Sequence, residues 1–270
     1  GHHRPICETV TVSITRGEHF RECLPVFPRR SQNNQNCPVC PGSFFYLAEK
    51  LSCVNPSEKE LVRKTEQFVR KEALPADSGH DWEHTRRVRH LALQIHEREG
   101  KGDRLVIELA ALLHDIADSK FHHGDENLGG RIATRFLEEN GLDQRRTGMI
   151  REIIDQVSFK HLARPGTARS DEFMIVQDAD RLDAIGAIGI ARAFSYGGYK
   201  GRMMHDPRIP VRTYKTSDEY KRSDAPTINH FYEKLLKLKD RMNTETGRDI
   251  AEERHRFMEL FLDHFLKEWG

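Results

Sequence analysis

From residue 57 to the C-terminus, apolar residues recur three and four positions apart, and no run of residues alternates with a period of two. This spacing places apolar side chains on one face of an α-helix, whereas a half-buried strand requires alternation. Glycines such as Gly100, Gly141 and Gly186 fall between the periodic segments, where helices commonly end. The pattern therefore predicts an all-α fold.

We expect the first helix at 58–73, because Ser57 and Glu60 have the spacing of a capping box. Two further helices carry the apolar faces Val88–Ile95 and Leu105–Ile116. The remaining predicted helices are 126–140, 145–157, 171–184, 187–197, 227–241 and 247–268. Residues 198–226 contain glycine, three prolines and many charges, which predicts a long loop or lid that joins two halves of one domain.

Residues 1–55 differ from the rest of the chain. They lack apolar periodicity and contain all five cysteines, while the other residues contain none. We expect a poorly ordered N-terminal extension at 1–55, followed by one domain at 56–270. Cys37 and Cys40 have half of a zinc-ribbon spacing, but no second pair of ligands follows them. So uneven a distribution of cysteines does not suit a disulfide scaffold, and we expect a reducing, cytoplasmic location.

The charge balance bears on the choice of partner. The chain has 43 Lys and Arg against 42 Asp and Glu, so it lacks the general positive field that favours nucleic acid or anionic lipid. No apolar run approaches the ~20 residues of a membrane helix. We therefore expect a small-molecule partner, with no membrane and no nucleic acid, and a homo-oligomer remains open.

His-Asp pairs occur three times in the sequence, so the dipeptide alone carries little information. The pair His114-Asp115 differs from the others because it ends the apolar helix that contains residues 109–113. Unpaired ionisable groups at the end of a buried helix cost several kcal/mol. His114 and Asp115 are therefore expected to have polar partners in the folded protein.

Two more polar residues are predicted to face the core. His84 shares a helix face with Val88, and Asp180 shares one with Val176. Together with His114 and Asp115 they supply two imidazoles and two carboxylates, a ligand set that suits Mn²⁺, Fe²⁺, Mg²⁺ or Zn²⁺ with positions open to water and substrate. The alternative is that a helix end or an ion pair satisfies each residue separately.

Three strings carry a resemblance to a known family. They are HDWEHTRRV at 80–88, LLHDIADSKFH at 112–122 and QDADRLDAIGAIGIARAF at 177–194. The order H…HD…D on helices resembles the HD-domain superfamily of metal-dependent phosphohydrolases, over about 57–268. These strings look like a bacterial-type branch whose members include nucleoside triphosphate pyrophosphohydrolases. The resemblance implies a single HD-domain helical bundle.

The resemblance also implies one divalent metal ion, bound by His84, His114, Asp115 and Asp180. We expect Mn²⁺, with Mg²⁺, Fe²⁺, Co²⁺ and Zn²⁺ as alternatives. Asp118 matches the position where related enzymes carry an acidic residue that orients or deprotonates the attacking water. Its alternative is a helix-end carboxylate paired with Lys120 or Arg87.

Further residues are candidates for contact with the substrate. We predict a catalytic role for Lys120, because cations beside a metal suit a polyphosphate. Asp183 either fixes a ligand imidazole or pairs with Arg181 or a helix end. The other candidate substrate-binding residues are His122, His123, Lys160, Arg192 and Tyr196, with Phe194 and Tyr199 beside Tyr196 as a wall for a nucleobase.

The function predicted from these features is hydrolysis of a nucleoside triphosphate to a monophosphate and pyrophosphate. A nucleoside monophosphatase or a cyclic-nucleotide phosphodiesterase would use the same metal site and is the main alternative. A nucleotide-sensing protein without turnover is a further alternative, although all four ligand positions are filled. A nucleic-acid enzyme would need a longer basic stripe than Arg86, Arg87 and Arg89 provide.

Overall fold

The computed structural model describes residues 56–72, 81–116, 128–157, 169–214 and 224–270, all within the unit Val54–Gly270. Within these ranges it contains helices and no strand, which confirms the predicted all-α fold. The helices are α2 (Pro56–Glu72), α3 (Trp82–Glu99), α4 (Arg104–Leu113), α5 (Leu128–Glu139), α6 (Gln144–Val157), α7 (Asp171–Asp183), α8 (Gly186–Tyr199), α10 (Thr227–Glu233), η2 (Leu235–Lys237), η3 (Lys239–Arg241) and α11 (Glu245–Trp269). The predicted extension at 1–55 lies outside the described residues.

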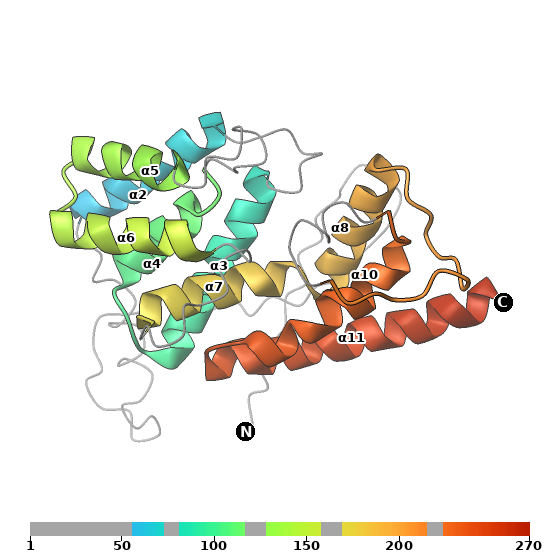
Figure 1. The fold of residues 1–270 in the computed structure, drawn as a ribbon. Helices are drawn as coiled ribbons and strands as arrows, with labels where there is room; N and C mark the ends of the chain where they lie inside the picture. Colours follow the sequence, from blue (N-terminus) through green and yellow to red (C-terminus); the bar gives the residue numbers. More distant parts are fainter. Residues whose placement is uncertain (1–55, 73–80, 117–127, 158–168, 215–223) are drawn as a thin grey trace, which may run out of the picture. The chain divides into compact units, whose positions relative to one another are not determined.

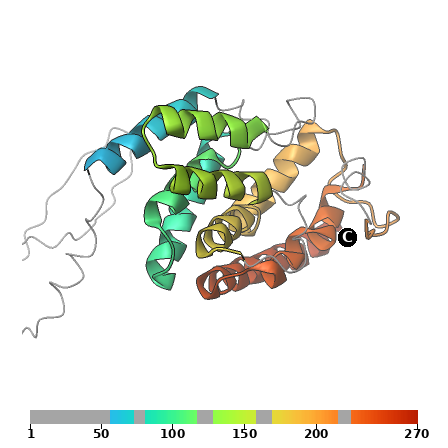
Figure 2. The ribbon, with the colours of Figure 1, turned by 60° about the vertical axis from the view of Figure 1, so that its left-hand side comes forward.

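Helix α7 is central to the packing of this unit. It contacts α3, α4, α6, α8 and α11, and Figure 1 shows it between the group α2–α6 and the group α8, α10 and α11. Helices α5 and α6 lie side by side (Figure 2). None of the described helices has the length and apolarity needed to cross a membrane.

Helix α4 forms the middle of the core. Each residue from Leu105 to Leu113 is buried, so the helix is apolar all round apart from Glu108, which pairs with Arg89 of α3. Burial of this helix is a major contribution to stability, at roughly 1.5–3 kcal/mol for each large apolar side chain. Its C-terminal end carries His114 into a buried position.

Side chains fix where the helices begin. Asp81 is the N-cap of α3, and its carboxylate accepts a hydrogen bond from the backbone N–H of His84 at 2.8 Å. Asp103, Ser170 and Thr244 cap α4, α7 and α11 in the same way. The first His-Asp pair of the sequence therefore supplies a helix cap, and this cap sets the helical turn from which His84 projects.

The structure differs from the expected helix at 227–241. Helix α10 ends at Glu233, and the two short 3₁₀ helices η2 and η3 follow it. Lys234 breaks the helix with φ −137° and ψ −56°. Leu235 and Leu238 are both buried, and a 3₁₀ helix places residues three apart on one face. Tertiary packing thus overrides the longer helix.

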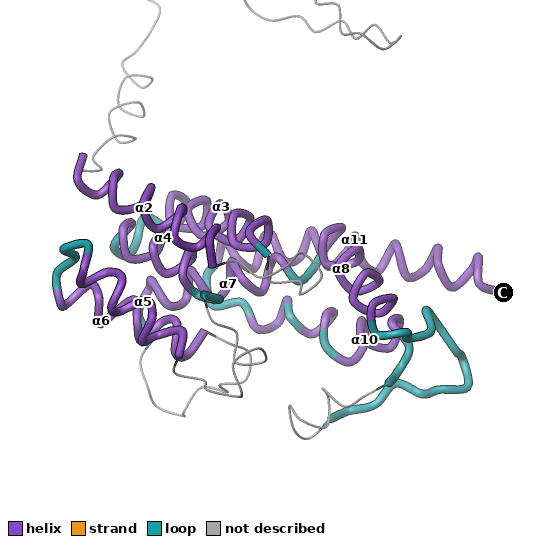
Figure 3. The backbone as a smooth tube through the Cα atoms, turned by 90° about the horizontal axis from the view of Figure 1, so that it is seen from above, coloured by secondary structure: helices purple, strands orange, loops and turns teal. Residues whose placement is uncertain are grey.

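The predicted loop at 198–226 starts later than expected, because α8 continues to Tyr199. Residues 202–214 contain neither helix nor strand, and Figure 3 shows this loop beside α10. Residues 215–223 lie outside the described residues. Whether the loop acts as a lid stays a prediction.

A buried carboxylate joins α7 to the start of α11. Asp178 is fully buried and accepts hydrogen bonds from the backbone N–H groups of Asn243 and Thr244, at 2.9 and 2.8 Å. The Thr244 hydroxyl donates to the same carboxylate at 2.8 Å. A Cβ atom at Gly247 would lie 2.5 Å from Asp178 Oδ2. The close approach of the two helices therefore requires glycine at this position.

We predict opposite effects for alanine at two helical glycines. Gly247→Ala should lower the free energy of unfolding by about 1–3 kcal/mol, because the new methyl group displaces Asp178. Gly148→Ala, in α6 with nothing within 4 Å of the added Cβ, should raise it by up to ~1 kcal/mol through helix propensity. Urea unfolding followed by circular dichroism measures both; a neutral Gly247→Ala would show that α11 can shift away from Asp178.

Candidate metal centre

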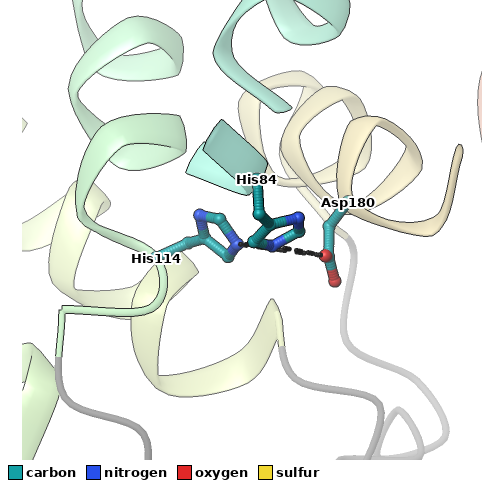
Figure 4. Close-up of side chains that lie close together, drawn as sticks. All are labelled: His84, His114 and Asp180. Carbon is teal, nitrogen blue, oxygen red and sulfur yellow. Dashed lines mark hydrogen bonds and ion pairs between the residues drawn. The ribbon is translucent and has the colours of Figure 1, made fainter. Parts of the chain in front are cut away.

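Three helix ends bring the four predicted ligands together. His84 lies in the first turn of α3, His114 and Asp115 follow the end of α4, and Asp180 lies in the last turn of α7. Figure 4 shows the two imidazoles and the Asp180 carboxylate pointing toward one another. Residues nearly 100 positions apart in the chain thus meet at one point.

The distances between the candidate ligand atoms are short. The Nε2 atoms of His84 and His114 lie 3.2 Å apart. Asp115 Oδ2 lies 3.3 Å from each of these nitrogens. Asp180 Oδ1 is 3.6 Å from His84 Nε2 and 3.9 Å from His114 Nε2. Two nitrogens and two oxygens therefore converge on one small volume.

The hydrogen bonds of the two Nδ1 atoms determine whether the two Nε2 atoms face this volume with a lone pair. His114 Nδ1 lies 2.9 Å from the Ala111 carbonyl oxygen, which can only accept, so Nδ1 carries a proton. His84 Nδ1 lies 2.7 Å from Asp183 Oδ2 and donates to it. A neutral imidazole with its proton on Nδ1 has a lone pair on Nε2. Both Nε2 atoms are then acceptors.

This donor set fits a divalent cation. Two facing lone pairs and two carboxylates repel one another, and both imidazoles are buried, so a cation between them removes an unfavourable arrangement. Mixed nitrogen and oxygen ligands suit Mn²⁺, Fe²⁺, Co²⁺ and Zn²⁺. The side chains of Asp115 and Asp180 are 23% and 30% exposed, so one side of the site is open to water and substrate.

The pKa values of His84 and His114 are both raised, which shows that the neighbouring carboxylates favour a positive charge in this volume. Burial lowers the pKa of His114, but the nearby carboxylates of Asp115 and Asp180 outweigh it and raise the pKa to about 9. For His84, burial again lowers the pKa, and hydrogen bonds to Asp115 and Asp183 raise it by more. Without a metal ion, the site therefore retains a proton at neutral pH.

Asp183 connects His84 to two arginines. Its carboxylate is 1% exposed and accepts from Arg87 Nε at 2.6 Å and from Arg192 Nη1 at 2.6 Å, in addition to His84. Burial raises the pKa of Asp183, whereas the hydrogen bonds from His84 and Arg87 and the charge of Arg192 lower it well below its usual range. Of the two alternatives for Asp183, its carboxylate takes the imidazole, and Arg181 instead donates to the Arg241 carbonyl.

Arg87 is a residue whose contact the sequence analysis did not predict. The sequence suggests Arg87 as a partner of Asp118 or as part of a basic stripe, and in the structure its guanidinium binds both oxygens of Asp183. The available signal was its spacing, because Arg87 follows His84 by three residues on one helix face.

The remaining predicted residues fall into two groups. Tyr196 lies on α8, 46% exposed, with the cations of Lys200 and Arg202 each 5.7 Å from its ring centre. Phe194 is partly buried and packs with Phe231, Phe261 and Phe265, and its role as a wall for a nucleobase stays a prediction. Other predicted residues lie outside the described ranges: Asp118, Lys120, His122, His123 and Lys160.

Comparisons with known proteins show which family the chain resembles. The HD domain family matches residues 81–185. The Bacillus subtilis protein YpgQ is 40% identical over 212 residues, which cover 78% of this chain and 95% of YpgQ. The crystal structure of an HD-superfamily hydrolase from Bacillus thuringiensis is 44% identical, with a TM-score of 0.63 over 78% of this chain and 98% of that chain.

A crystal structure of YpgQ in complex with ADP aligns with a TM-score of 0.59 and 33% identity, over 77% of this chain and 97% of that chain. The segment that matches the HD domain family begins at the N-cap of α3 and ends just after Asp183, so it contains all four converging ligands. The chain belongs to the HD-domain superfamily of phosphohydrolases. HD domains bind divalent metal ions, and the identity of the metal here stays a prediction.

We predict that Asp183→Asn weakens Mn²⁺ binding about 10–100-fold, the usual effect of losing a carboxylate behind a ligand imidazole. The matched control is Asp178→Asn, which alters a buried carboxylate of the same helix that holds α11 and contacts no candidate ligand. It should lower the Tm and leave the Mn²⁺ affinity unchanged. Isothermal titration and thermal melts on both variants measure this. An equal loss of affinity in both would show that Asp183 acts only through the fold.

The pH dependence of stability should change with metal removal. The pKa of His114 rises from 6.5 to about 9 in the folded protein, so its protonation stabilises the metal-free fold fully below pH 6.5 and progressively less toward pH 9. The Tm of chelator-treated protein should therefore fall across this range. Saturating Mn²⁺ should abolish the fall, and His114→Gln should reduce it. If the Tm of the wild type falls equally with and without Mn²⁺, the fall does not come from protonation of His114.

Proposed function

We propose that the protein hydrolyses a nucleoside triphosphate to the monophosphate and pyrophosphate with the help of a bound divalent metal ion. The observation that carries the proposal is the convergence of two imidazole Nε2 atoms, 3.2 Å apart, with two partly exposed carboxylates. The ADP complex of its relative YpgQ supports a nucleotide as the ligand.

The residues proposed to hold the metal are His84, His114, Asp115 and Asp180. A divalent ion held there would polarise a phosphoryl oxygen and acidify a water molecule. The buried imidazoles are held by hydrogen bonds from their Nδ1 atoms, so their Nε2 atoms keep one direction. The partly exposed carboxylates leave the opposite side for the substrate.

Phosphate groups need cations, and two arginines lie beside the cluster. The side chains of Arg87 and Arg192 are 29% and 28% exposed, and both pair with the single carboxylate of Asp183. These three groups together carry one net positive charge, which would attract a phosphate near the site. Their bonds to Asp183 keep both guanidinium groups close to His84.

Asp118 is proposed from the family resemblance, and the other residues from the charge or aromatic character of their side chains. Asp118 would orient or deprotonate the attacking water, and Lys120 would stabilise the charge that develops on the phosphate. The proposed substrate-binding residues are His122, His123, Lys160, Arg192 and Tyr196, while Asp183 acts through His84 and the two arginines.

The test is a panel of nucleoside tri-, di- and monophosphates and cyclic nucleotides, assayed with Mn²⁺, Mg²⁺ and Co²⁺. We expect pyrophosphate and a monophosphate in equal amounts from triphosphates, with no orthophosphate. Release of orthophosphate from monophosphates would favour a nucleoside monophosphatase, and opening of cyclic nucleotides a phosphodiesterase. Nucleotide binding without turnover would favour a sensing protein and refute hydrolysis.

Two variants serve as controls in the same assay. His114→Ala should lose metal and activity together. Asp118→Ala should keep its metal while kcat falls by about 10²–10⁴, the usual contribution of general acid or base catalysis. An Asp118→Ala protein with full kcat would exclude the proposed role of this carboxylate.

A further inference from the structure

Helix α11 packs against the other helices with one side only. It has 25 residues and is the longest helix that the structure describes, and Figure 1 shows α7 and α8 on the same side of it. On that side Met258 and Leu262 are buried, and Phe261 contacts Phe194 of α8. The other side of the helix is exposed to solvent.

The exposed side of α11 carries two large apolar residues next to each other. Phe257 and Leu260 lie three residues apart, one turn of the helix, and are 49% and 55% exposed. The neighbouring strip of the helix is charged and exposed throughout, as is usual for a surface in water; it consists of Glu252, Arg256, Glu259 and Asp263. Adjacent large apolar side chains on an otherwise charged surface are typical of a contact with another molecule.

Charged residues continue this apolar pair in both directions along the helix. We call the whole stripe the outer face of α11, and its six exposed residues are Asp249, Glu253, Phe257, Leu260, His264 and Lys267. Successive members are three or four residues apart, so they share one face of the helix. The outer face is thus acidic before the apolar pair, and after it carries an imidazole and an ammonium group.

This order of side chains is complementary to itself in the antiparallel direction. A second copy of α11, related by a two-fold axis near Met258, would place its Lys267 opposite Asp249 and its His264 opposite Glu253. Its Leu260 would lie opposite Phe257. Each pair then occurs twice, as a two-fold interface requires. A parallel copy would instead place acidic residues against acidic residues.

The ion pairs that these residues form within the chain leave them able to make this contact. Asp249 lies 3.9 Å from Arg98, and Lys267 donates to Asp263 at 2.6 Å. All four side chains are more than half exposed, and ion pairs of this kind contribute little to stability. Charges at the rim of an interface mainly select the partner and fix its orientation, while the apolar centre supplies the affinity.

We propose that the outer face of α11 binds the same face of a second copy of this chain, with the two helices antiparallel. The partner is a second copy because the charges of this face complement themselves and the apolar pair lies at their centre. The interface is formed by α11 alone and does not depend on the hydrolytic activity proposed above.

The first test measures the dissociation constant of the dimer by sedimentation equilibrium of the full chain. Leu260→Lys places a charge in the apolar centre and should raise the dissociation constant about tenfold or more, as for other residues at the centre of an interface. The matched control is Leu266→Lys, which changes the same residue type on the same helix. Leu266 is 38% exposed and lies about 120° around the helix from Leu260, so this variant should dissociate like the wild type.

The second test exchanges charges between the two ends of the outer face. Asp249→Lys would face Lys267 of the second copy and should raise the dissociation constant about three- to tenfold, because attraction becomes repulsion at two places. The double variant with Asp249→Lys and Lys267→Asp should return to the wild-type value. These two positions are about 27 Å apart along one helix, so the rescue cannot arise within a single chain.

Circular dichroism of each variant checks that the helices remain intact. If Leu260→Lys does not fold, the exchange of charges at the exposed positions 249 and 267 decides alone. A wild-type chain that is monomeric at every concentration would overturn the proposal, and the outer face would then be open to a different protein. A dimer that a folded Leu260→Lys variant leaves unchanged, or a double variant no tighter than Asp249→Lys, would also overturn it.

Discussion

The hydrogen bonds to the buried Asp183 carboxylate join three helices beside the candidate metal centre. This one group receives a donor from α3 twice, through His84 and Arg87, and one from α8, through Arg192. A buried carboxylate without partners would be strongly destabilising. Helices α3, α7 and α8 are therefore fixed to one another by the same interaction that orients the imidazole of His84.

Helix α7 carries a structural contact and part of the candidate site at different positions along its length. Asp178 holds the start of α11, Asp180 faces the imidazoles, and Asp183 accepts the hydrogen bond that orients His84. The three carboxylates lie within six residues, yet successive helix positions turn them toward different neighbours. A short polar run after an apolar stretch thus serves one structural contact and one functional site.

The sequence was sufficient for the features that depend on local periodicity. The all-α class and most helix positions follow from apolar spacing. Spacing indicated only that His84 and Asp180 face inward, and the family resemblance was needed to expect that they converge with His114. Contacts between distant segments could not be predicted in this way. The choice of Asp183 between His84 and Arg181 depends on how α3 packs on α7, and the break after Glu233 accompanies the burial of Leu235 and Leu238 in the core.

The two imidazoles obtain their orientation from very different sources. His114 donates to Ala111, three residues away in its own helix, whereas His84 donates to a side chain 99 residues away. One ligand is therefore directed as soon as α4 exists, and the other only after distant helices have assembled. Contacts between residues so far apart in the chain form late in folding, because the entropic cost of closing the long loop between them has to be met before the contact can form. A metal ion at the candidate centre would therefore meet its complete set of ligands only after these helices have packed, and it would then stabilise the finished fold.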